Sequence, residues 1–126
     1  AQGTIDGLLS SKENLGVISF IAASIDHQDM NGLREIADIL RDKLKSGVIV
    51  LASEYQGKVN LVAAATKDVV NKGVHSGNLI REVAKITGGG GGGRPDMAQA
   101  GGKDPSKILQ ALENVKVLLS QQLGIK

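Results

Sequence analysis

The chain has 126 residues, of which 41% are hydrophobic and 22% charged, and its formal net charge is +2. This length and composition are typical of one globular domain with a buried core. The absence of cysteine excludes disulfides and thiolate-bound metals, and no apolar run approaches the roughly 20 residues that span a bilayer. Because residues 1–14 have no basic start and no apolar centre, they do not form a signal peptide, and we expect a cytoplasmic protein without a membrane partner.

Apolar periodicity predicts the first elements. Residues 1–13 show no periodicity, so residues 1–14 are expected to be a leader from a preceding segment and residues 15–126 a single domain. The β-branched and apolar residues 17–24 predict a buried strand. Asp29 is expected to cap a helix that ends near Ser46 and Gly47, where glycine suits a C-cap. Its inner face comprises Leu33, Ile36, Ala37, Leu40 and Leu44.

Two further strands and a second helix are predicted in the middle of the chain. Residues 47–54 and 59–66 are almost continuously apolar, and a tight turn over 55–58 joins them as an antiparallel hairpin. Residues 67–75 are expected to be a connector with one helical turn. Ser76 is expected to cap a helix that runs to about Thr87. Its inner face comprises Leu79, Ile80, Val83 and Ala84.

The last elements are a short strand over 97–100 and a helix that starts at Asp104 and Pro105 and runs to about Leu123. The inner face of this helix comprises Ile108, Leu109, Ala111, Leu112, Val115, Leu118 and Leu119. The order of elements predicts an α/β domain with helices packed on a mixed β-sheet, as a two-layer or three-layer sandwich.

Six consecutive glycines, 88–93, are the most unusual feature of the sequence. They are typical either of a structured binding loop or of a flexible linker. An Arg/Asp/Gln/Lys cluster follows them rather than more Gly and Ser, which favours a loop whose bare backbone meets a phosphate. Residues 58–107 carry a net charge of +4 and residues 1–57 carry −3. This asymmetry fits a phosphate-bearing partner, although a solvated basic surface is the alternative.

Two common phosphate-binding motifs do not fit the glycine region. The Walker loop requires Ser or Thr after Gly-Lys, whereas Asp104 follows Lys103. The glycine spacing of a dinucleotide site is present, but a predicted helix precedes it and Pro95 follows it. The remaining hypothesis is a groove of glycine N–H groups that faces a nucleic-acid backbone between Arg94 and Lys103. Arg94 could instead pair only with Asp96.

Catalysis finds little support in the sequence. There is no cysteine nucleophile and no G-x-S-x-G motif, and His27 and His75 lack the spacing of metal ligands. We therefore expect no catalytic residue, metal or cofactor. The only aromatic residues, Phe20 and Tyr55, are too few to form a base-stacking platform. Recognition of folded RNA by backbone shape and charge remains open.

The segment 88–103, GGGGGGRPDMAQAGGK, resembles the signature of the C-terminal domain of alanyl-tRNA synthetases, called C-Ala, which is a DHH-associated domain. Segments 29–34, 42–51, 61–68 and 103–106 are also similar, so the resemblance covers about residues 15–123. It implies a non-catalytic part of a ligase that binds the elbow of tRNA(Ala), contacts other synthetase domains and links aminoacylation with editing.

The resemblance also limits which roles transfer to this chain. Arg94 stands where the related DHH phosphoesterases have histidine, and the spacing to Ala100 and Gly101 is longer, so the histidine role does not transfer. An assembly module that forms homo-oligomers is the alternative function, and the substrate-binding half of a DHH-type phosphoesterase is a third. Lys67, Lys72, Arg81 and Lys85 are expected to give weaker electrostatic support. The candidate RNA-binding residues are Gly88, Gly89, Gly90, Gly91, Gly92, Gly93, Arg94, Gln99 and Lys103.

Overall fold

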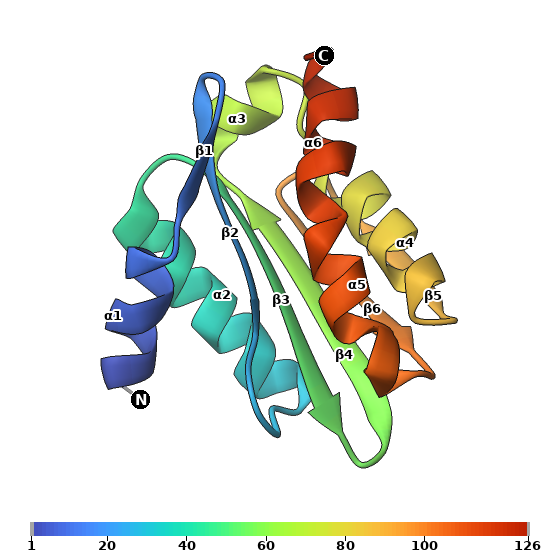
Figure 1. Cartoon of the computed structure of the whole chain (residues 1–126). Coiled ribbons are helices and arrows are strands. Elements are labelled where there is room, and N and C mark those ends of the chain that lie inside the picture. The colour runs from blue at the N-terminus through green and yellow to red at the C-terminus, as the bar shows by residue number, and fades with distance from the viewer. Residues whose placement is uncertain (1, 126) are drawn as a thin grey trace.

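A mixed six-stranded sheet with helices on both faces forms the domain (Figure 1). The computed structural model describes residues 2–125. The elements are α1 (Gln2–Ser10), β1 (Glu13–Leu15), β2 (Ile18–Ser24), α2 (Met30–Leu44), β3 (Val48–Tyr55), β4 (Lys58–Ala65), α3 (Lys67–Asn71), α4 (Ser76–Ile86), β5 (Gly90–Gly93), β6 (Met97–Gly102), η1 (Pro105–Lys107), α5 (Ile108–Glu113) and α6 (Val115–Leu123). The strand order is β1-β2-β3-β4-β6-β5, in which β2 and β3 are parallel and all other neighbours antiparallel. The predicted α/β class is confirmed, in its three-layer form.

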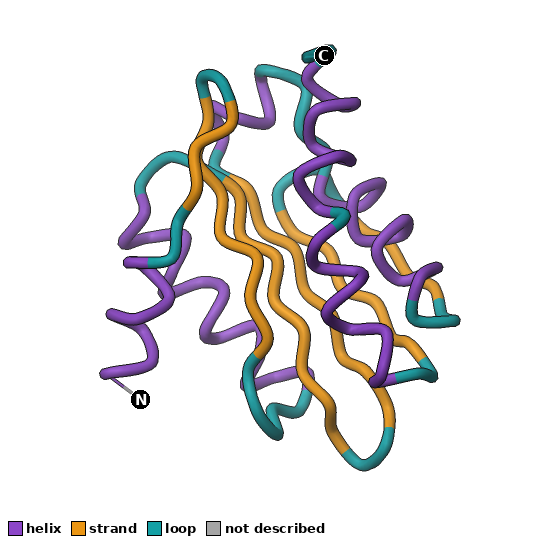
Figure 2. The backbone as a smooth tube through the Cα atoms, viewed as in Figure 1, coloured by secondary structure: helices purple, strands orange, loops and turns teal. Residues whose placement is uncertain are grey.

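The sheet separates two apolar clusters. Helices α1 and α2 cover one face, and α4, α5 and α6 cover the other (Figure 2). Successive side chains of a strand point to opposite faces, so Ile49 and Leu51 of β3 pack under α2. Val48 and Val50 of the same strand pack with α4–α6. The continuous apolar run of β3 is therefore buried on both faces, as predicted for a central strand.

Several local predictions are confirmed in detail. Asp29 caps α2, because its Oδ1 accepts a hydrogen bond from the N–H of Gly32 at 2.8 Å. Strands β3 and β4 form the expected hairpin, and the φ angles of Gln56 and Gly57 are +53° and +78°. Two positive φ angles define the type I′ turn that matches the twist of a hairpin. Phe20 is buried in the core.

Two predicted helix caps are wrong. Helix α2 ends at Leu44 and its C-cap is Lys45, with a φ of +68°, two residues before Gly47. Gly47 instead lies against β2, where a Cβ would come within 2.5 Å of the Ser19 carbonyl oxygen. Helix α4 is capped by His75, whose Nδ1 accepts a hydrogen bond from the N–H of Asn78 at 3.0 Å. Ser76 is the first helical residue and is buried, and Nδ1 of His75 provides the capping acceptor one position earlier.

The final helix also differs from its prediction. Asp104 caps η1 as expected, but the chain breaks at Asn114 into α5 and α6. Leu109 is predicted on the inner face but is 70% exposed. The buried stripe follows Ile108 at i, i+3, i+4 and i+7, and Leu109, one residue after Ile108, lies about 100° around the helix from it. The buried set is Ile108, Ala111, Leu112, Val115 and Leu119.

The N-terminal residues form α1 and β1. Ile5 of α1 is buried in the cluster under α2, and the partly buried Leu8 and Leu9 pack against the same cluster. These residues are spaced at i, i+3 and i+4, a short apolar stripe that the sequence-based prediction missed. Within residues 2–125, the structure contains no helix with the length and apolar character required to cross a bilayer.

Candidate nucleic-acid interface

The glycine run forms a strand at the edge of the sheet rather than the predicted loop. Gly90–Gly93 make up β5, which pairs only with β6 in the strand order. Gly91 lies opposite Ala100 and Gly92 opposite Gln99 in an antiparallel register. A ladder of backbone hydrogen bonds requires no side chains, so a segment without apolar alternation can still be a strand. The flexible-linker interpretation is therefore wrong for these four residues.

Close packing explains why β5 has no side chains. A Cβ on Gly91 would lie 2.5 Å from the Cα of Ala100. Real Cβ atoms essentially never lie within 3.0 Å of such an atom. At the start of α4, a Cβ on Gly77 would lie 2.3 Å from the carbonyl oxygen of Gly93. Strand β5 is thus packed between β6 and the first turn of α4 at distances that only glycine allows.

The first turn of α4 also holds the hairpin turn between β5 and β6. The N–H of Ser76 donates to the carbonyl oxygen of Pro95 at 2.8 Å, and that of Gly77 donates to Arg94 at 3.1 Å. The first N–H groups of a helix have no partner within the helix. Here they bind the turn carbonyls, so the backbone of Arg94 is fixed by α4.

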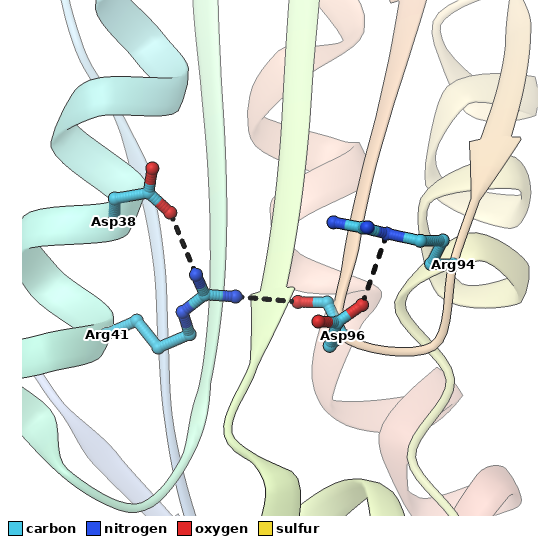
Figure 3. Close-up of polar contacts among 4 residues, drawn as sticks. All are labelled: Asp38, Arg41, Arg94 and Asp96. Carbon is cyan, nitrogen blue, oxygen red and sulfur yellow. Dashed lines mark hydrogen bonds and ion pairs between the residues drawn. The ribbon is translucent and has the colours of Figure 1, made fainter.

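Helix α2 contacts the same turn from the opposite side through Arg41. Its Nη1 donates to the carbonyl oxygen of Asp96 at 3.0 Å, and its Nη2 pairs with Asp38 Oδ1 at 2.9 Å (Figure 3). The Asp96 carboxylate pairs with Nε of Arg94 at 3.4 Å. The expected alternative, an Arg94–Asp96 pair, is therefore present. The Arg94 side chain is nevertheless 74% exposed, and exposed ion pairs contribute little free energy, so Arg94 stays available to a ligand.

The hydrogen-bond pattern of the hairpin orients the glycine N–H groups. Arg94 donates its N–H to the carbonyl oxygen of Met97 at 3.0 Å. Residues of an antiparallel pair alternate between bonding across the ladder and pointing away from it. This alternation turns the N–H groups of Gly91 and Gly93 away from β6, and both residues are exposed. Gly91 therefore presents a main-chain donor at the sheet edge without a side chain of its own. The nitrogen of Gly93 lies close to the first turn of α4, where a Cβ on Gly77 would be 2.9 Å from it.

The other predicted contacts lie along this hairpin. Gln99 is exposed on β6, and Lys103 is exposed directly after β6. The N–H of Lys103 donates to the carbonyl oxygen of Thr87 at 2.8 Å, which places Lys103 beside Gly88. Arg94 lies opposite Met97, six residues before Lys103, so the two cations lie at opposite ends of the hairpin, about 20 Å apart at the usual rise of a strand. This spacing suits two separate phosphate groups rather than a shared one.

The cations expected to give weaker support are scattered. A Cβ on Gly92 would lie 3.9 Å from Nη2 of Arg81, so Arg81 is beside β5. Lys85 pairs with Glu82 at 2.9 Å. Lys67 lines a separate groove of about 730 Å³, together with Arg41, Lys45, Asp42 and Asp96, and Lys72 lies at the C-terminus of α3.

The carboxylate next to Lys103 is kept ionised by its own turn. Asp104 accepts hydrogen bonds from the hydroxyl of Ser106 at 2.6 Å and from its N–H at 3.0 Å. These bonds, with the nearby charge of Lys107, lower the pKa of Asp104. Among residues 2–125 there is no group of three or more His, Cys, Asp or Glu side chains that could hold a metal ion.

Sequence reasoning missed one residue of this surface. A hollow of about 350 Å³ lies beside β5, and Arg34 of α2 lines it with Gly92, Gly93, Arg94 and Gln99. Arg34 is 60 residues from Arg94 in the chain. The only feature of the sequence that could have indicated Arg34 is its position directly after the inner-face residue Leu33, on a helix whose inner face was predicted correctly.

Known proteins resemble the chain closely. Residues 17–121 match the DHHA1 domain. Over 98% of the chain, 54% of residues are identical to an alanine–tRNA ligase of Alkaliphilus oremlandii, and over 99% of it 50% are identical to that of Roseiflexus sp.. The chain spans 14% of the length of each of these relatives.

Solved structures agree with this relationship. The C-Ala domain of alanyl-tRNA synthetase from Aquifex aeolicus superimposes with a TM-score of 0.78 and 38% identity, covering 86% of this chain and 97% of that domain. RecJ from Thermus thermophilus matches with a TM-score of 0.64 at 12% identity, over 95% of this chain and 17% of RecJ, which shows a shared fold alone. The chain therefore belongs to the DHHA1 domain family, among the C-Ala domains of alanyl-tRNA synthetases.

Proposed function

We propose that the chain is the tRNA-binding module of an alanine–tRNA ligase. In this proposal the β5–β6 hairpin docks against the elbow of tRNA(Ala) and so links aminoacylation with editing on one bound tRNA. The other domains of the ligase are then its further partners. The relatives named above are alanine–tRNA ligases, which supports tRNA as the ligand.

The glycine edge strand is the observation that carries the proposal. Gly91 is exposed and its N–H points away from β6, so a phosphate can approach this donor without a glycine side chain in the way. Arg94 adds an exposed guanidinium at one end of the hairpin, and Lys103 adds an exposed ammonium at the other. Folded RNA is recognised largely through its phosphates and ribose hydroxyls, which this arrangement of donors suits.

The test is a gel-shift titration with a tRNA(Ala) transcript at two salt concentrations. Arg94→Ala and Lys103→Ala should each weaken binding roughly 5- to 10-fold near physiological salt, because each removes a charged hydrogen bond to a phosphate. Each should also lower the slope of log affinity against log salt by about one. Lys116→Ala is the matched control, because Lys116 is an exposed lysine of α6 outside the hairpin.

A tRNA(Ala) variant with a disrupted elbow completes the test. It should bind more weakly than the intact transcript, and elbow docking is wrong if the two bind equally well. Unchanged affinity and slope in the Arg94→Ala/Lys103→Ala double variant, with unchanged circular dichroism, would remove the hairpin from the binding surface.

Assembly with another protein is a second candidate, and the surface of α5 and α6 favours it. Leu109 is 70% exposed and Val117 is 52% exposed on these neighbouring helices. An apolar interface should depend weakly on salt, whereas phosphate binding weakens steeply as salt rises. Sedimentation at two salt concentrations therefore distinguishes an oligomer from the RNA-binding monomer.

A further inference from the structure

The hollow beside β5 is lined by two arginines from distant parts of the chain. Arg34 projects from α2, and Arg94 follows the last residue of β5. Between them lie the backbones of Gly92 and Gly93 and the side chain of Gln99. Its volume of about 350 Å³ is within the range of small-molecule sites.

The position of Arg34 follows from the contact of α2 with the hairpin turn. Arg34, Asp38 and Arg41 are spaced at i, i+4 and i+7, so they lie on one side of α2. Arg41 of this stripe touches the Asp96 carbonyl (Figure 3). Seven residues correspond to about 10 Å along a helix, which carries Arg34 from the turn toward the body of the hairpin.

The charge of this hollow differs from that of the larger groove. Within the described part of the chain, no acidic side chain lines the hollow, whereas Asp42 and Asp96 line the groove that contains Arg41 and Lys67. Arg34 is exposed and makes no ion pair with any residue in the range 2–125. Arg94 has one exposed partner, the Asp96 carboxylate at 3.4 Å, which lies outside the lining of the hollow. The charge of Arg34 is not balanced by an ion pair, so the lining is net positive and would attract an anion.

We propose that Arg34 and Arg94 clamp one phosphodiester group of the bound RNA. The clamp rests on the proposed function and adds a residue to its site. A guanidinium presents a planar fork of donors that matches phosphate oxygens, and two forks can bind one phosphate from both sides. The bare glycine backbone between them lets the diester lie close to the sheet, and the open hollow lets the RNA chain pass through.

The experiment measures binding of the tRNA(Ala) transcript by this chain and four variants. These are Arg34→Gln, Arg34→Lys, Arg94→Gln and the double glutamine variant. Arg34→Gln should weaken binding about 5- to 10-fold and lower the salt slope by about one. Arg34→Lys should keep the salt slope and lose part of the affinity, because lysine retains the charge without the fork. Lys43→Gln is the control, because Lys43 is exposed on the opposite side of the same helix.

A double-mutant cycle tests whether the two arginines share one phosphate. If they do, Arg34→Gln should weaken binding less than about 2-fold once Arg94 is already glutamine. Additive losses would place the arginines on separate phosphates and overturn the clamp. The clamp is also overturned if Arg34→Gln binds the transcript as tightly as Lys43→Gln does. If Arg94→Gln still weakens binding in that case, the proposed function stands. If the Arg34, Arg94 and Lys103 variants all bind like the unsubstituted chain, the proposed function fails as well.

Discussion

Adjacent glycines of β5 occupy very different surroundings. A Cβ on Gly90 would have no heavy atom within 4 Å, whereas a Cβ on Gly91 would meet both the Cα of Ala100 and the carbonyl oxygen of Gln99 at 2.5 Å. Neither residue has a positive φ angle, so the difference is one of space alone. The six glycines are therefore not equivalent, although the sequence gives no basis for ranking them.

Alanine substitution tests this difference. Gly91→Ala should lower the free energy of unfolding by about 1–3 kcal/mol, because the backbone of β6 must move to admit a methyl group. Gly90→Ala should change it by less than about 0.5 kcal/mol, as is usual for exposed positions. Urea denaturation of both variants gives the comparison. Equal stabilities would show that β5 and β6 are not in close contact.

The arginines illustrate which parts of the site the sequence reveals. Arg94 and Lys103 flank a recognisable motif, so reasoning along the chain finds them. Arg34 joins them only because β6 pairs with β4 and α2 packs across the sheet, which are long-range contacts. Periodicity predicts the inner face of α2 correctly but contains no information on which strand will lie beside it.

At the scale of elements, short polar side chains connect the helices. Asp68 in the first turn of α3 accepts hydrogen bonds from the hydroxyls of Ser46, after α2, and of Thr66, before α3. These bonds favour the charged carboxylate and lower the pKa of Asp68. Asp68 therefore ties the end of α2 to the start of α3.

The lowered pKa of Asp68 makes the stability of the fold depend on pH. A carboxylate with a lowered pKa stabilises the fold above its unfolded pKa of about 3.9, and this contribution is lost as the pH falls through the folded pKa. Asp68→Asn should therefore lower the melting temperature at pH 7, and its difference from the unsubstituted chain should shrink below about pH 4. Thermal unfolding from pH 7 to pH 2.5 measures this. Ser46→Ala should show a smaller version of the same dependence, and a difference that is constant with pH would contradict the assignment.

The errors at element boundaries have local physical causes. His75 caps α4 because its Nδ1 is an acceptor, although serine has the stronger intrinsic preference for that position. Lys45 ends α2 with a positive φ of +68°, while the nearby Gly47 allows the close approach to β2. Helix α1 packs through Ile5, Leu8 and Leu9, a stripe of one turn that is too short to stand out as a repeat in the sequence. At the helix ends, only for Gly47 does the deciding contact, with Ser19 of β2, lie far away in the sequence.

At the scale of the molecule, the proposed RNA surface and the exposed apolar side chains lie on different elements. The former comprises β5, β6, the turn between them and Arg34 of α2. The latter include Leu109 of α5 and Val117 of α6. The two sets share no residue, and Lys103, the proposed RNA contact nearest to α5 in the chain, precedes Leu109 by six residues.

Hydrogen–deuterium exchange can map the RNA surface on the whole chain. Addition of tRNA(Ala) should slow exchange in peptides that contain residues 88–103, where the N–H groups of Gly91 and Gly93 face outward. Peptides from α6 should exchange at the same rate with and without the tRNA. Protection confined to α5 and α6 would contradict the proposed surface.

Three elements hold the turn that carries Arg94: α4 through Ser76 and Gly77, α2 through Arg41, and β4 through the N–H of Ala65, which donates to the Asp96 carbonyl at 3.0 Å. The backbone here is ordered when the domain folds, and no further loss of conformational entropy is required when a ligand arrives. Such preorganisation lets even a modest number of contacts yield useful affinity. Because the turn is preorganised, a core substitution far from it should weaken RNA binding only as far as it unfolds the whole domain.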